Sequence, residues 1–177
     1  KPFLDLPRSF GLMMNVDWFK PFKHRNDFSV GVIYMVLMNL PRSIRFRKEN
    51  VLLVGIIPAL KHEPKSLNHF LNPAVDELNA LWKGVKVHTH NSPSSTVKMQ
   101  AAVLCFASDI PAARKLCGFL GHSARRGCSH CYKEFPGGFG EQRNYGGFQD
   151  WDQWPKRSSQ QHQRDAYQVK NCTSESA

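Results

Sequence analysis

The sequence lacks any long hydrophobic run. Its longest apolar stretch, VGVIYMVLMNL from Val30 to Leu40, falls well short of the ~18 to 20 residues that a membrane-spanning helix requires. It also lacks a signal peptide, and it begins at Lys1 rather than at a methionine. We therefore expect no membrane partner, and the start at Lys1 predicts a fragment of a longer protein.

Acidic residues are scarce. Against 24 Lys and Arg there are 14 Asp and Glu, which gives a net charge of +10. This excess favours a polyanionic partner, with nucleic acid first and an anionic membrane surface second. With 41% hydrophobic residues among 177, the composition is otherwise that of one globular domain able to bury a core.

Cysteine is present in an odd number, and only one pair is closely spaced. The five residues are Cys105, Cys117, Cys128, Cys131 and Cys172. This pattern excludes the disulfide framework of a small secreted protein and indicates a reducing compartment, with metal-binding or free thiols.

The first third of the chain predicts three strands. Apolar and β-branched residues dominate Phe10–Phe19, Phe28–Pro41 and Asn50–Pro58, and a basic connector, Arg42–Glu49, precedes the third. The third strand is apolar on both faces, which is typical of the interior of a sheet.

The period then changes from strand to helix. Helical spacing predicts a helix over Ser66–Gly84, kinked or split at Pro73, and another over Ile110–Gly121. Between them, VKVHTH and TVKMQAAVLCFASD flank the turn NSPSS as a hairpin. We predict one domain over residues 1–135 and, over 136–177, a region that is mostly loop with a helix near Ser159–Asn171.

The order of these elements predicts a topology. Three sequential strands favour an antiparallel meander, and a right-handed helical crossover can return the fourth strand to the side of the first. Asp17 and Asp109 would then lie side by side at the edge of the sheet. We therefore predict an α/β fold with the mixed sheet of a ribonuclease H-like core.

A pair of carboxylates at one sheet edge is suited to Mg²⁺, which activates a water or a 3′ hydroxyl in phosphodiester chemistry. Each acid also has a structural interpretation. Asp17 can cap a turn or pair with Lys20 or Lys23, and Asp109 can be the N-cap of the following helix. A third acid is expected, and no candidate stands out. The candidates are Glu134, Glu141, Asp150, Asp152, Asp165 and Glu175.

The segment Cys128-Ser-His-Cys131 has the spacing of half a tetrahedral Zn²⁺ site. Cys117, His122, His130 and His162 are the other possible zinc ligands nearby. Two alternatives remain open, namely free thiols and a redox pair, although a redox pair usually begins at a helix N-terminus.

Clusters of basic residues predict contacts with nucleic-acid phosphates, although such runs also form solvated surfaces. The residues chosen are Lys20, Lys23, Arg45, Arg47, Arg125 and Arg126. Trp18, Phe19 and Phe22 can stack on an unpaired base or pack in the core.

Four stretches together resemble the transposase of CACTA (En/Spm-type) DNA transposons. They are NVDWFKPF, YMVLMNLPRSIRFRKENVLLVGIIPA, HEPKSLNHFLNPAVDELNALWKG and SDIPAARKLCGFLGHSARRGCSHCYKEFP. The resemblance runs from about Phe10 to Tyr145, and it is specific because the separate blocks occur in the order of the family.

The resemblance implies a ribonuclease H-like DDE/D transposase that is nuclear, multimeric when full length, and active on DNA at transposon ends. Asp17 and Asp109 match its first two catalytic acids, which hold Mg²⁺ or Mn²⁺. Cys128 and Cys131 match the zinc-binding pair that follows. In the intact family protein, water cleaves the phosphodiester at a transposon end, and the freed 3′ hydroxyl attacks target DNA.

The sequence departs from the family after the cysteines. The family continues into a Met-His block, which supplies a zinc-ligand histidine, and later into a third acid. Neither is recognisable before Ala177. The resemblance therefore implies a partial catalytic core over residues 1–135, including the C-x-x-C loop, and a truncated insertion region over 136–177. We expect a transposase fragment that does not cut DNA by itself. The alternatives are a non-catalytic nucleic-acid-binding protein or relic domesticated from such a transposase and, third, a thiol-redox domain.

Overall fold

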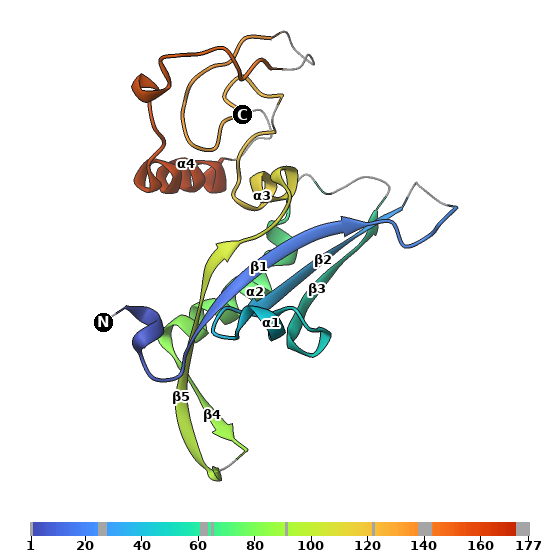
Figure 1. Cartoon of the computed structure of the whole chain (residues 1–177), viewed down its shortest axis with the longest axis vertical. Helices are drawn as coiled ribbons and strands as arrows, with labels where there is room; N and C mark the ends of the chain where they lie inside the picture. The colour runs from blue at the N-terminus through green and yellow to red at the C-terminus, as the bar shows by residue number, and fades with distance from the viewer. Residues whose placement is uncertain are drawn as a thin grey trace. The chain divides into compact units, whose positions relative to one another are not determined.

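The computed structural model describes residues 2–24, 28–60, 64, 66–90, 92–121, 123–137 and 143–172. They fall into two compact units, Lys1–Ala113 and Arg114–Ala177. Figure 1 shows the strands of the first unit as blue to yellow-green arrows. The strands are β1 (Ser9–Phe19), β2 (Ser29–Leu37), β3 (Val51–Leu60), β4 (Val85–Thr89) and β5 (Ser92–Phe106), and the α-helices are α1 (Arg42–Arg45), α2 (Asn68–Lys83), α3 (Ile110–Leu116) and α4 (Ser159–Asn171).

The five strands form one mixed sheet in the order β3-β2-β1-β5-β4. β1 pairs antiparallel with β2, and β2 pairs antiparallel with β3, so the predicted meander is confirmed. β5 lies beside β1 and runs parallel to it, as the crossover predicted. The predicted hairpin is also present, because β4 and β5 pair antiparallel. Figure 1 shows that this hairpin projects beyond the other strands.

The core lies on one face of the sheet. Side chains alternate along a strand, so Leu12, Met14 and Val16 of β1 point to the same face, and all three are buried. Their neighbours on β2 include Ile33, which is also buried. α2 packs against β5 and β3 and contributes the buried Ala74.

The prediction that β3 is an interior strand is wrong. β3 is at the end of the strand order, and Leu53 and Ile56 are 64% and 59% exposed. An apolar sequence on both faces makes a strand suitable for burial on both faces of a sheet. It does not say where in the sheet the strand lies.

Two predicted helices differ in their bounds from the observed ones. α2 runs without a break through Pro73, so of the two predicted effects of this proline the split is wrong, and the kink stays a prediction. Gly84 closes the helix with a φ of +96°, as expected. α3 ends at Leu116 rather than near Gly121. Gly118 has a φ of +70°, and its N–H bonds the carbonyl of Lys115, which ends the helix one turn early.

The second unit is mostly loop. Its core is the buried Phe135, whose ring centroid lies 4.5 Å from that of Tyr145 and 5.3 Å from that of Trp154. The C-terminal helix is confirmed as α4, where the Ser158 hydroxyl caps the helix by accepting from the Gln161 N–H at 3.2 Å. The predicted domain boundary after residue 135 lies inside this unit. No helix among the described residues is long and apolar enough to cross a membrane.

Candidate functional site

Two acids lie near the carboxyl ends of the neighbouring strands β1 and β5. The backbone ladder pairs Met14 with Phe106. Beyond it, the Ala107 N–H donates to the Met14 carbonyl at 2.9 Å, and the Val16 N–H donates to the Ser108 hydroxyl at 3.0 Å. The two segments therefore stay in step, at an offset of 92 residues, as far as Val16 and Ser108. Asp17 and Asp109 are the next residue of each segment.

Asp17 lies on the face of β1 opposite the core. It is exposed, and its Oδ1 accepts a hydrogen bond from the Trp18 N–H at 2.8 Å. Phe19 and Phe22 follow with 48% and 55% exposure. Core packing is therefore the wrong interpretation for these two rings, whose role in stacking on a base stays a prediction.

Asp109 begins α3. Its Oδ1 accepts from the Ala112 N–H at 2.8 Å, which is the N-cap contact that the sequence allowed, and the residue is exposed. A cap uses one oxygen of the carboxylate. It therefore leaves Oδ2 for a second ligand, and the N-cap and metal-ligand interpretations of this residue are compatible.

The donor set of the acid pair fits a hard divalent cation in part. Two exposed carboxylates, each with one oxygen engaged by a backbone N–H, offer the oxygen ligands that Mg²⁺ or Mn²⁺ prefers. Within the described ranges, no group of three or more His, Cys, Asp or Glu side chains is close enough to hold a metal. The pair alone supplies part of a coordination shell, and water or further groups must supply the rest.

The predicted third acids all belong to the second unit. Glu134 pairs with two arginines, Asp150 accepts from Lys133 and Trp154, and Asp165 accepts from Gln161. Glu141 and Glu175 lie outside the described residues. No third acid is assigned by these contacts.

The predicted phosphate-binding residues of the first unit lie at two ends of the sheet. Lys20 and Lys23 follow the end of β1 and are exposed near Asp17. Arg45 and Arg47 follow β2, near the start of β1, about 20 Å away along the strand.

Arg45 is engaged by the fold itself. Its Nε donates to the Leu40 carbonyl at 3.0 Å, and its Nη2 donates to the carbonyls of Met38 at 2.7 Å and Leu40 at 2.8 Å. These contacts hold the turn after β2, and a role of Arg45 in DNA binding stays a prediction.

Arg125 and Arg126 both pair with Glu134 in the second unit. Arg125 Nη2 lies 2.5 Å from Glu134 Oε2, and Arg126 Nε lies 3.0 Å from Oε1. The charge of Arg125 and the hydrogen bonds and charge of Arg126 hold the pKa of Glu134 below its usual 4.5. The arginine side chains are 72% and 58% exposed, so they keep surface available to a phosphate.

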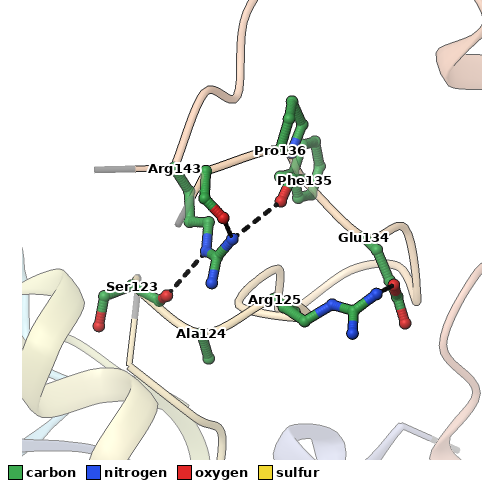
Figure 2. A pocket seen from close by; sticks show the side chains of 8 residues that line it. Ser123, Ala124, Arg125, Glu134, Phe135, Pro136 and Arg143 are labelled. Carbon is green, nitrogen blue, oxygen red and sulfur yellow. Dashed lines mark hydrogen bonds and ion pairs between the residues drawn. The ribbon is translucent and has the colours of Figure 1, made fainter. Parts of the chain in front are cut away.

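Figure 2 shows the pocket beside this cluster. Arg143 Nε donates to the Ser123 carbonyl at 2.9 Å, and its Nη1 donates to the carbonyls of Phe135 and Gly137. The guanidinium therefore ties the loop around Ser123 to the segment that follows Phe135.

The C-x-x-C segment forms a tight turn in which the two thiols face each other. The His130 N–H donates to Cys128 Sγ at 3.3 Å, and Cys131 is 5% exposed. Burial raises the pKa of Cys128, but hydrogen bonds from the His130 backbone and from the Cys131 thiol outweigh it, so the pKa is lowered overall. Burial raises the pKa of Cys131.

Arg157 stabilises this turn through hydrogen bonds to its backbone, and no sequence pattern predicted this role. Its Nε donates to the carbonyls of Cys128 and Cys131 at 3.0 and 3.1 Å, and its Nη2 donates to the Arg126 carbonyl at 3.2 Å. Its guanidinium carbon lies 4.2 Å from the centroid of the Tyr132 ring. No local signal in WPKRSS marks a contact across 26 residues.

Two thiols held in this way fit one half of a tetrahedral zinc site. His130 is exposed, the His162 ring stacks on Phe119 at 4.7 Å, and burial raises the pKa of Cys117. His122 lies outside the described residues. Zinc binding and the identity of the other ligands stay predictions.

Fold and site together define a mixed α/β protein with an acidic pair at the end of a parallel strand pair and a separate cysteine turn. The sequence profile described as the transposase family tnp2 matches residues 1–165. The chain therefore belongs to the transposase family tnp2. No curated protein matches it.

Proposed function

We propose that the chain forms part of the catalytic core of a CACTA-type transposase with a ribonuclease H-like fold. The observation that carries the proposal is the parallel pairing of β1 and β5, because Asp17 lies on β1 and Asp109 follows the end of β5. Membership of the transposase family supports DNA as the partner, and the net charge of +10 suits a phosphate backbone.

In this proposal the two carboxylates hold Mg²⁺ or Mn²⁺ through the oxygens that the backbone N–H groups leave free. A metal held there would activate a water and stabilise the leaving oxygen of the phosphodiester. The protein's own residues orient the acids. Ser108 accepts from β1, and the cap between Asp109 and Ala112 fixes the start of α3.

The cysteine turn has a separate role. Cys128 and Cys131 would hold Zn²⁺ together with ligands not yet assigned, and Arg157 would keep the turn in shape. Arg125, Arg126, Lys20 and Lys23 would contact DNA phosphates without reading sequence. We include a nuclear location in the proposal, because transposition acts on chromosomal DNA. We also include a multimeric full-length protein, which the resemblance to the transposase family implies.

The test uses the full-length protein of which this chain is part, with a plasmid that carries the transposon ends and with Mg²⁺. Asp109→Asn is the informative variant, because asparagine also caps a helix and so preserves the contact with Ala112. We expect it to lose DNA cleavage and keep its zinc content and DNA binding. Cleavage that survives in this variant contradicts the proposal.

The excess of positive charge favours a second candidate function, non-catalytic nucleic-acid binding. It predicts binding that falls steeply with salt, does not depend on Mg²⁺, and is accompanied by no nicking of the plasmid. These readouts come from the same protein preparation, so one experiment separates the two functions.

A further inference from the structure

We propose that Asn15 is a positioning residue for the acid pair, which sets the spacing of Asp17 and Asp109 for a divalent cation. The inference rests on the proposed metal-binding role of that pair. Asn15 lies two positions before Asp17 in the segment MMNVDWF. Neither the composition nor the periodicity of this segment marks Asn15 as a functional residue.

Asn15 shares a face of the sheet with Asp17. Side chains alternate along β1, and the core takes Met14 and Val16, so positions 15 and 17 both point to the opposite face. The second face becomes more open along the strand, since Asn15 is half-buried and Asp17 is exposed. On this face of β1, Asn15 is therefore the half-buried polar residue that directly precedes the exposed Asp17.

The side-chain amide of Asn15 binds the strand that leads to the second acid. Its Nδ2 donates to the carbonyl of Ala107, one residue past the end of β5. The ladder between the strands ends at Phe106, and one further backbone hydrogen bond joins the Ala107 N–H to the Met14 carbonyl. Asn15 binds the carbonyl of that same residue and so adds a side-chain contact where the backbone pairing ends. Only Ser108 then separates this contact from Asp109.

The other end of the same amide is unused. Asn15 Oδ1 is buried and has no hydrogen-bond partner in the part of the chain that the structure describes. A buried carbonyl oxygen without a partner is unfavourable, and such atoms mark places where a water or ion belongs to the site.

A matched control lies at the opposite end of β1. Asn39 Nδ2 donates to the Ser9 carbonyl at 3.1 Å, and its Oδ1 accepts from the Gly11 N–H at 2.8 Å. Like Asn15, it uses an amide to tie another segment to β1, but it does so far from the acids. Because Asn39 makes two such hydrogen bonds and Asn15 makes one, Asn39→Ala should cost at least as much stability as Asn15→Ala without changing the acid pair.

The experiment measures Mn²⁺ binding to the 177-residue chain by isothermal titration calorimetry, with circular dichroism and thermal unfolding on every variant. Asp17→Asn and Asp109→Asn define the binding that depends on the acids. We expect Asn15→Ala to weaken that binding about tenfold, equivalent to about 1.4 kcal/mol, and Asn39→Ala to stay within about twofold.

Each outcome is decisive. If the two acid variants lose binding and Asn15→Ala binds like the wild type, this inference alone is wrong. Equal weakening by Asn15→Ala and Asn39→Ala also overturns it, because the effect is then one of general stability. If the acid variants bind Mn²⁺ like the wild type, or the wild type binds none, the proposed metal site fails and the inference falls with it.

Asn15→Asp covers the case in which the alanine variant does not fold. It keeps the shape of the side chain, but an ionised carboxylate cannot donate to the Ala107 carbonyl. We expect weaker Mn²⁺ binding in spite of the added negative charge. Equal or tighter binding would mean that charge rather than spacing controls the site, and the inference would be rejected.

Discussion

Val16 and Ser108 lie opposite each other at the end of the parallel strand pair, with the Val16 N–H donating to the Ser108 hydroxyl at 3.0 Å. Val16 is 1% exposed, so its N–H has little access to water. The Ser108 hydroxyl therefore accepts from β1 in place of a backbone carbonyl, just after the end of β5 and directly before Asp109.

Ser108→Ala should therefore destabilise the first unit. The buried N–H of Val16 loses its acceptor, which costs about 1 to 2 kcal/mol of the free energy of unfolding. Urea unfolding followed by circular dichroism measures this loss. Ser108→Thr keeps a hydroxyl and is the control, with an expected change below about 0.5 kcal/mol. Equal stabilities for the alanine and threonine variants would show that this hydrogen bond contributes nothing.

Gly84→Ala should be more costly than Gly118→Ala. Both glycines have a positive φ, +96° and +70°, where a side chain is strained. A Cβ at Gly84 would also meet the far end of the exposed Lys98 side chain, which can move aside, and would lie 3.1 Å from both Lys98 Cγ and Gln100 Cγ, which are less free to move. A Cβ at Gly118 meets nothing within 4 Å.

We expect Gly118→Ala to destabilise its unit by about 1 kcal/mol and Gly84→Ala by roughly 2 to 3 kcal/mol. Thermal unfolding compares the two variants directly. An effect at Gly84 no larger than that at Gly118 would mean that the side chains of Lys98 and Gln100 move aside at little cost.

Arg157→Lys should loosen the cysteine turn. A lysine ammonium is a single point of charge and cannot reproduce the planar fork that donates to the carbonyls of Cys128, Cys131 and Arg126. If the turn binds zinc, we expect roughly tenfold weaker affinity in a chelator competition. Arg164→Lys, on the exposed surface of α4, is the matched control and should leave the affinity unchanged. Equal zinc affinities for the two variants would show that Arg157 does not stabilise the cysteine turn.

The two thiols of the turn should react differently with iodoacetamide in metal-free protein. The pKa of Cys128 is lowered from 9.0, so its thiolate forms at lower pH than that of an ordinary cysteine. Cys131 is buried and its pKa is raised from 9.0, so its thiolate forms at higher pH. Mass spectrometry across a pH series should show Cys128 modified first. Added zinc should protect both residues if they are ligands, and modification of Cys131 first would contradict the hydrogen-bond pattern of the turn.

Local patterns predicted most of the elements. The apolar run over Phe10–Phe19 predicted β1 to within one residue at its start, and the glycine at position 84 predicted the end of α2. The prediction for α3 failed because two glycines, Gly118 and Gly121, compete for the end of the helix. Either can adopt a positive φ, and the sequence does not rank them.

The juxtaposition of Asp17 and Asp109 was predictable for a different reason. The handedness of the crossover leaves few places for the strand that ends near Asp109, and one of them is beside β1. The contacts that hold the two segments in step were not predictable. An asparagine and a serine in an apolar strand and its extension have many possible partners, and only the register of β1 on β5 selects Ala107 and Val16.

The sequence by itself determined the strands, the capped helices, the excess of positive charge and the positions of the acids and cysteines, because each depends on residues close together in the chain. Only the tertiary structure decided that β3 lies at the edge of the sheet, that Asn15 binds the segment before Asp109, and that Arg157 holds the cysteine turn. These contacts join residues 26 to 92 positions apart, and their geometry is set by the packing of the whole sheet and loop rather than by any local preference.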